Sequence, residues 1–286
     1  MPFTLALLLQ ADDPGNRNLL ILGAAILGCL IVLGLRFFRS LFEVITAPQA
    51  SLGYHGRNDG FMHSLMIVLL GGLIGTLVIF TQLTSIQAGL GAFAQAVSSM
   101  VSNGATNKNY ADVVGATALN TVNQNLDNYI VNNLILLPLL VVAIWILASF
   151  LAFLFSKMLG GQASMPGMAG ALAYAYFFLA IGGCMSASVQ IGMLPSMFGA
   201  GAAGTPEMGA LTIIGLILQL FGVILFLMGI SQGGDLTIGA TVGVLIFMMV
   251  ILVGAQYFTF YKGKQSFDAW VSTLQSTNPA VGGRGT

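Results

Sequence analysis

Long apolar runs dominate the hydrophobic pattern of this chain. A membrane-spanning helix needs about 20 mostly apolar residues, and six stretches meet that requirement. They are residues 19–35, 61–80, 134–155, 168–192, 211–230 and 236–258. None has a charged side chain in its central part. Because helices satisfy their own backbone hydrogen bonds in lipid, the pattern predicts an all-α, polytopic transmembrane helix bundle of about six spans.

The stretch between the first two runs, RFFRSLFEVITAPQASL, has a different pattern. Helical spacing separates an apolar face from a polar one. The apolar side chains are Phe38, Leu41, Phe42 and Ile45, and the polar ones are Arg36, Arg39, Ser40 and Glu43. Such a helix lies along a membrane surface, and Pro48 ends it because the residue before proline leaves the helical region. We predict a membrane-interface site formed by Arg36, Phe38, Arg39, Phe42 and Pro48.

A polar insertion separates the second and third runs, and it is patterned rather than irregular. Apolar residues recur three and four positions apart along both of its limbs, as expected for helices that pack together. They are Leu83, Ile86, Leu90, Phe93, Val97 and Met100, followed by Leu119, Val122, Leu126 and Tyr129. The turn formers SNGATNKN lie between the limbs. We expect an extramembrane amphipathic helical hairpin over residues 82–131 that projects beyond the membrane; the alternative is that both limbs lie on its surface.

These elements divide the chain into four parts. An N-terminal segment with an extra span covers residues 1–35, an interfacial helix and loop cover 36–60, a five-span bundle with the hairpin covers 61–258, and a tail covers 259–286. Basic residues flank the spans unequally and predict that the Arg36–Gly60 loop is cytoplasmic. Arg36, Arg39, Arg57 and Lys157 favour this orientation, Lys108 opposes it, and so do Lys262, Lys264 and Arg284 in the tail.

Composition agrees with a membrane protein and excludes other classes. The chain is 57% hydrophobic and 6% charged, against about 25% charged residues in soluble domains. Nine basic and nine acidic side chains cancel, so no charge excess recruits nucleic acid. Membrane lipids are the expected surroundings. Both cysteines, Cys29 and Cys184, lie inside predicted spans, where they serve as small packing residues.

Small residues recur on single faces of the predicted spans. Gly71 and Gly75 form one G-x-x-x-G, Gly239 and Gly243 form a second, and three further glycines repeat every seven residues in the fifth span. Such faces let helix backbones approach closely. The predicted helix-packing residues are Gly71, Gly75, Gly215, Gln219, Gly222, Gly229, Gly239 and Gly243. Gln219 shares the face of Gly215 and Gly222, so we expect it to make one interhelical hydrogen bond; solute binding is the alternative.

The chain has little catalytic chemistry. Coupled transporters place carboxylates or histidines at mid-membrane, whereas His55 and His63 here lie at span ends or in a loop, and Asp235 is expected to cap the sixth span. Ser186 and Ser188 have no nearby base to activate them. Met165 and Met168 are the nearest approach to a soft-metal pair. We therefore expect no catalytic, cofactor or metal site and no enzymatic activity.

Two stretches give the chain a family resemblance. FFRSLFEVITAPQASL, and LGGQASM leading into a span with Tyr174 and Tyr176, are similar to the Yip (Ypt-interacting protein) membrane-domain family, particularly its short prokaryotic members. The Asp-Leu-Tyr-Gly-Pro-like motif of eukaryotic members is missing, and an extra span precedes the domain. The resemblance implies a non-enzymatic scaffold or accessory protein of a prokaryotic inner membrane, without the vesicle-trafficking partners of eukaryotic members.

Two functional hypotheses follow from these patterns. The first is a non-enzymatic, multi-pass scaffold or accessory subunit that associates with other integral membrane proteins or with copies of itself. The second is a permease or channel component for a neutral small solute, which would use Gln219, Ser186, Ser188 and Gln190. A membrane enzyme is a third, remoter alternative, which would need a cofactor held by backbone groups or a partner subunit.

Overall fold

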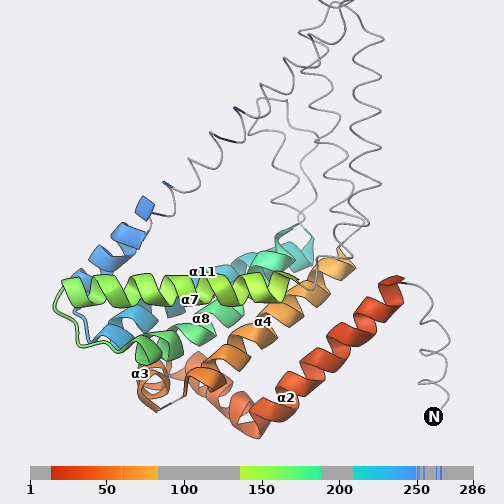
Figure 1. Cartoon of the computed structure of the whole chain (residues 1–286), viewed down its shortest axis with the longest axis horizontal. Helices are drawn as coiled ribbons and strands as arrows, with labels where there is room; N and C mark the ends of the chain where they lie inside the picture. The colour runs from red at the N-terminus through yellow and green to blue at the C-terminus, as the bar shows by residue number, and fades with distance from the viewer. Residues whose placement is uncertain are drawn as a thin grey trace, which may run out of the picture. The chain divides into compact units, whose positions relative to one another are not determined.

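The computed structural model describes residues 14–58, 60–82, 136–187 and 209–248, together with positions 250, 251, 254, 262 and 265. Every regular element in these ranges is a helix, which confirms the predicted all-α bundle (Figure 1). The helices are α2 (Pro14–Thr46), α3 (Pro48–Asn58), α4 (Phe61–Thr81), α7 (Leu136–Met158), α8 (Met165–Met185) and α11 (Ala210–Gly234), followed by the shorter apolar helix Ile238–Met248.

Five of these helices are long and apolar enough to cross a membrane: α2 from Leu19 onward, α4, α7, α8 and α11. The chain is therefore an integral membrane protein. The helix Ile238–Met248 covers the first part of the predicted sixth span, and the remainder of that span lies mostly outside the described residues. The predicted hairpin over residues 82–131 also lies outside them, apart from Gln82, as does most of the tail.

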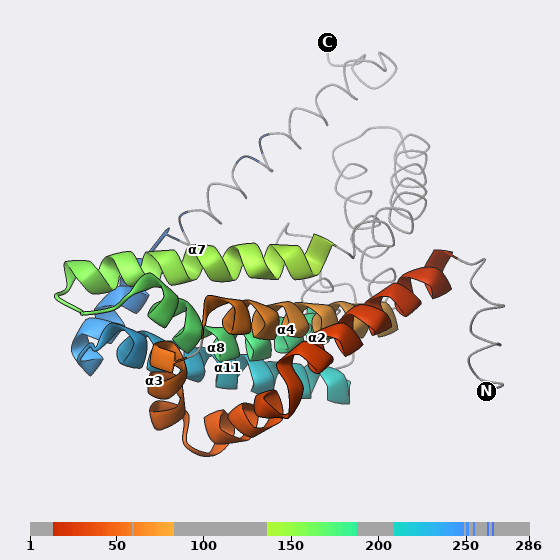
Figure 2. The same ribbon diagram turned by 60° about the horizontal axis from the view of Figure 1, so that its bottom comes forward.

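Helix α8 is the centre of this part of the chain, with α3, α4, α7 and α11 packed around it (Figure 2). It is the most buried of the five long helices. Its N-terminal half consists largely of alanine and glycine. Side chains this small let the backbones of neighbouring helices approach closely, and such close packing is what holds helices together in lipid. The polar group of a buried tryptophan is also satisfied here, because Trp145 Nε1 of α7 donates to the Ala169 carbonyl at 3.1 Å.

Helix α2 combines the predicted first span and the predicted interfacial helix in one element. Gly34 interrupts it with φ 61° and ψ −166°, a combination essentially restricted to glycine. The chain thus changes direction just before Arg36, where the sequence placed the boundary between span and interface. The helix ends at Thr46, and Pro48 is the first residue of α3. Helix α3 was not predicted: it occupies the region from which the sequence indicated only a loop.

Candidate functional site

A polar pocket of about 250 Å³ lies at one end of the bundle. Its walls come from four places: α3, the α7–α8 connection, the first turn of α8 and the C-terminal end of α11. Four glycines, two glutamines, a serine and an aspartate form its lining. These residues are Gly53, Gly56, Gln162, Ser164, Gly167, Gln232, Gly233 and Asp235. The helices α7 and α11 end near the pocket, and α8 begins there. The pocket therefore lies at one end of the spanning helices and not at their middle.

The α7–α8 connection is shaped by two glycines. Gly160 has φ 84°, a left-handed conformation that favours glycine. Gly161 donates its N–H to the Ser156 carbonyl at 2.8 Å, and a Cβ on it would meet Ser156 Oγ and, at 2.6 Å, the Gly234 carbonyl. The next residue, Gln162, donates its N–H to the same Gly234 carbonyl at 3.2 Å. These contacts fix the connection directly against the end of α11.

The first turn of α8 begins at Ser164. Its side chain caps the helix by accepting a hydrogen bond from the Gly167 N–H at 3.2 Å. Capping satisfies one of the N–H groups that a helix N-terminus leaves without a partner. Pro166 lies in this first turn, where its missing N–H has no cost. The pocket therefore has an ordered helix start on one side.

The end of α11 differs from the prediction. Asp235 was expected to cap the sixth span, but it ends α11 in the left-handed conformation, with φ 54° and ψ 41°. Thr237 caps the following helix instead, since the Ala240 N–H lies 3.4 Å from its Oγ1. Aspartate tolerates this left-handed backbone better than most residues. Asp235 lines the pocket next to the last turn of α11.

Helix α3 forms the remaining wall and is held by close backbone contact. A Cβ on Gly56 would lie 3.0 Å from the Gly167 carbonyl, and a Cβ on Gly170 would lie 3.0 Å from the His55 carbonyl. Below these glycines the His55 ring, 1% exposed, packs at 5.1 Å from the ring of Tyr174. Only a helix with glycines at these positions can lie so near α8, so the pocket depends on the small residues of both helices.

The lining of the pocket is polar, with few groups that could take part in catalysis. Its lining residues include two amides, a hydroxyl and one carboxylate, and the Ser164 hydroxyl already accepts from the Gly167 N–H. In the part of the chain that the structure describes, no three His, Cys, Asp or Glu side chains come together. A small polar ligand held by hydrogen bonds is what this arrangement suits.

The predicted helix-packing glycines have different surroundings. A Cβ on Gly71 would lie 2.8 Å from Phe177 Cα, and one on Gly229 would lie 2.8 Å from the Ala171 carbonyl. Gly75, Gly215 and Gly222 have equally close neighbours on α8. The second G-x-x-x-G is different: a Cβ on Gly243 would make an ordinary 3.5 Å contact with Leu159, and one on Gly239 would meet no described atom within 4 Å.

Gln219 is half-buried between α11 and the C-terminal end of α8. Its Nε2 donates to Ser186 Oγ at 2.9 Å, so this glutamine makes the interhelical hydrogen bond that the sequence suggested. Gln82 reaches the same end of α8 from α4, with Nε2 at 3.3 Å from both the Cys184 and the Met185 carbonyls. Ser188 and Gln190, the other polar residues considered for a solute path, lie outside the described residues.

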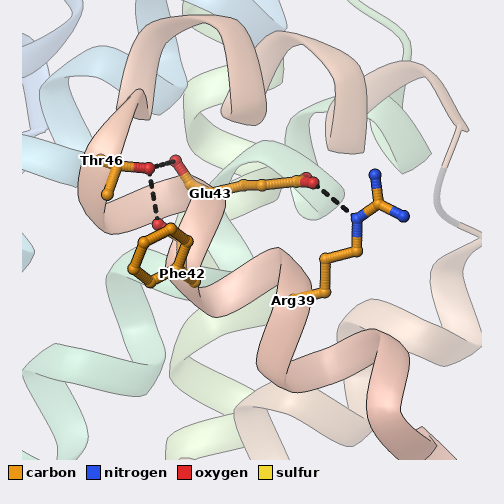
Figure 3. Close-up of polar contacts among 4 residues, drawn as sticks. All are labelled: Arg39, Phe42, Glu43 and Thr46. Atoms are coloured by element: carbon orange, nitrogen blue, oxygen red, sulfur yellow. Dashed lines mark hydrogen bonds and ion pairs between the residues drawn. The ribbon is translucent and has the colours of Figure 1, made fainter.

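Four of the predicted interface residues, Arg36, Phe38, Arg39 and Phe42, lie on α2, and Pro48 begins α3. This part of α2 has three distinct faces. At 100° per residue, Phe37, Ser40 and Val44 form a face buried against the bundle. A second face is apolar and exposed, with Phe38 54%, Phe42 67% and Ile45 50% exposed. The third contains Arg36, Arg39 and Glu43, and on it Arg39 Nε pairs with Glu43 Oε1 at 2.9 Å (Figure 3). Ser40 was assigned to the polar face and belongs to the buried one.

The pocket itself was missed from the sequence. The two connections that build it are GGQAS after α7 and SQGGD at the end of α11. Both combine a glycine pair with a glutamine, in the order GGQ in one and QGG in the other. Such residues indicate a turn, and nothing in either sequence says that the two connections meet.

Comparison of the chain with models of protein families, with curated proteins and with solved structures gives no match.

Proposed function

We propose that this integral membrane protein is a non-enzymatic scaffold or accessory subunit that associates with other integral membrane proteins or with copies of itself. The observation that supports the proposal best is the outer face of α2. This helix is the least buried of the five long ones, and it contacts mainly α3 and α4. Most of its apolar surface faces away from the rest of the described bundle.

The exposed face of α2 has a small-residue notch between large side chains. Ala24 and Gly28 are exposed one turn apart, and Ile31, 78% exposed, continues the same face up to the bend at Gly34. A Cβ on Gly28 would meet no atom of the described residues within 4 Å. Small residues let a second helix approach closely. The tightly packed glycines of α4 and α11 already contact α8, which leaves this notch for a partner.

The permease hypothesis has weaker support. Gln219 and Ser186, two of the polar side chains on which it depended, hydrogen-bond to each other at 2.9 Å. A solute passing between α8 and α11 would have to break that bond. The resemblance to the Yip family also implies an accessory role.

Affinity purification in a mild detergent tests the proposal. We expect a stoichiometric partner, or a homo-oligomer by light scattering, and we expect Gly28→Leu to abolish it because the added side chain fills the notch. Gly239→Leu is the matched control, since Gly239 also has open space around it and lies on a different helix. A wild-type protein that stays monomeric and mediates solute flux in reconstituted vesicles would overturn the proposal.

A further inference from the structure

Helix α2 is longer than a membrane span requires. Its part that is apolar enough to cross a membrane extends over 28 residues, from Leu19 to Thr46. At 1.5 Å per residue a helix of that length is about 42 Å long, whereas the hydrocarbon core of a bilayer is about 30 Å thick. Residues 19–35 alone have the length of a short span, since roughly 17 to 25 residues suffice. The rest of α2 is therefore available to leave the hydrocarbon core.

The direction of α2 changes where this remainder begins. Up to the bend at Gly34, α2 runs alongside α4, and beyond it the helix turns across the end of the bundle at which α3 lies (Figure 1 and Figure 2). Helix α3 contacts the first turn of α8 at that end, where a Cβ on Gly56 would lie 3.0 Å from the Gly167 carbonyl. Residues 35–46, here called the surface segment, thus run across the ends of spanning helices.

Two exposed stripes run side by side along the surface segment. The apolar stripe has one side chain per helical turn, and its members are all at least half exposed: Leu35, Phe38, Phe42 and Ile45. The charged stripe contains the ion pair of Arg39 and Glu43, with the arginine side chain 83% exposed (Figure 3). Charged side chains are costly in hydrocarbon, and exposed apolar patches mark contacts with protein or membrane. Both stripes are accommodated where hydrocarbon and water meet.

Lipid is the occupant that the charges and the chain connection favour for the apolar stripe. The surface segment follows directly on a helix long and apolar enough to span the membrane, so the bilayer boundary lies within its reach. Amphipathic helices with phenylalanine on the apolar face and arginine on the polar face lie in that boundary. Glu43 offsets Arg39, so burial of apolar side chains contributes more than attraction to anionic headgroups.

We propose that the surface segment lies in the plane of the membrane boundary and anchors this end of the bundle to the lipid surface. Its apolar stripe is inserted among the lipids, and Arg39 and Glu43 face the water. The first span then ends at the Gly34 bend. This anchor is independent of the proposed association through the notch at Ala24 and Gly28, which lies before the bend.

Spin-label depth measurements on the full-length protein test the proposal. Single cysteines are introduced after Cys29 and Cys184 are replaced by alanine, and the protein is reconstituted into vesicles of phosphatidylcholine and phosphatidylglycerol. Power saturation with oxygen and with a water-soluble nickel chelate then gives the depth of each label. Labels at Leu35 and Ile45 should lie at the same shallow depth, since such helices insert by about 5–10 Å. A continuous span would instead separate them by about 15 Å, because they are ten residues apart.

Exposed positions of the same helix provide the controls. A label at Leu27, 61% exposed, lies within the span and should be deeper than one at Leu35 by about 12 Å, the length of eight helical residues. A label at Phe42 should be more accessible to oxygen, and one at Arg39 more accessible to the nickel chelate. Phe38→Ser combined with Phe42→Ser should shift the Ile45 label towards water and leave the Leu27 label unchanged.

Three results would overturn the proposal. The first is a label at Leu35 that lies about 15 Å deeper than one at Ile45, as in a continuous span. The second is equal access of the nickel chelate to labels at Phe42 and Arg39, which would place the apolar stripe in water. The third is a Phe42 label shielded from both reagents, which would show that protein and not lipid covers the stripe.

Discussion

Gln219 of α11 hydrogen-bonds to Ser186 at the C-terminal end of α8, with Nε2 and Oγ 2.9 Å apart. Ser186 Oγ in turn lies 3.1 Å from the Gly182 carbonyl of its own helix. The serine hydroxyl can therefore donate to its own helix while it accepts from α11. Its partner glutamine lies beside Gly182, whose added Cβ would be 2.8 Å from the Gln219 N. Close backbone packing and a side-chain bond thus occur at the same point of this helix pair.

A double-mutant cycle should detect this bond. We expect Gln219→Leu and Ser186→Ala to be coupled by about 0.6 kcal/mol and at most roughly 1.7 kcal/mol, the range measured for such bonds within membranes. Unfolding by a denaturing detergent gives the free energies. Gln219→Leu paired with Thr46→Ala is the control, because Thr46 bonds to a carbonyl of its own helix α2 and the two effects should add. A coupling energy of zero between Gln219 and Ser186 would contradict the observed contact.

The two G-x-x-x-G motifs should respond differently to the same substitution. Gly71→Ala places a methyl group 2.8 Å from Phe177 Cα, a backbone atom that cannot rotate away. We expect a loss of about 1–3 kcal/mol in the free energy of unfolding, as for other overpacked interiors. Gly239→Ala meets open space and should leave stability unchanged or raise it slightly. Equal effects of the two substitutions on unfolding would show that the motifs have equivalent surroundings.

Gly34 should tolerate no side chain at the bend in α2. Its φ of 61° with ψ −166° costs a non-glycine residue about 1–3 kcal/mol. Gly34→Ala should therefore destabilise the protein by that amount in thermal unfolding, or shift the chain towards a straight helix. Gly23→Ala is the control within the same helix. A Cβ there meets no described atom within 4 Å, so it should be neutral or slightly stabilising. A Gly34→Ala protein that melts like Gly23→Ala would contradict the bend.

The spanning helices were predicted well from the sequence, because the length of an apolar run determines whether a helix can cross a membrane. The run expected at residues 61–80 is helix α4 at Phe61–Thr81, and the one expected at 211–230 lies within α11 at Ala210–Gly234. The start of α8 at Met165, three residues before the expected one, follows from the Ser164 cap. Capping is a local property, and the serine and proline that determine it are readable in the sequence.

The pocket and α3 were not predictable in the same way. Helix α3 has glycine at positions 53 and 56, which lowers helix propensity, and it forms because Leu52 and His55 are buried against the bundle. The pocket unites residues near positions 53, 162 and 232, whose proximity no local pattern encodes. The same applies to glycine motifs: Gly71 and Gly239 stand in identical patterns, and only tertiary packing distinguishes them.

The contact of His55 with Tyr174 should hold α3 in place. The histidine ring is 1% exposed, and removing a large buried side chain costs several kcal/mol, on the order of 2–4. In His55→Ala we expect faster hydrogen exchange along α3, because this helix loses the ring contact that holds it against α8. His55→Phe keeps a ring against Tyr174 and should restore most of the protection. Gln49→Ala changes an exposed residue of the same helix and should leave exchange unaltered. If His55→Ala left exchange in α3 unchanged while accelerating it elsewhere in the bundle, the ring contact would stabilise the bundle as a whole without anchoring this helix.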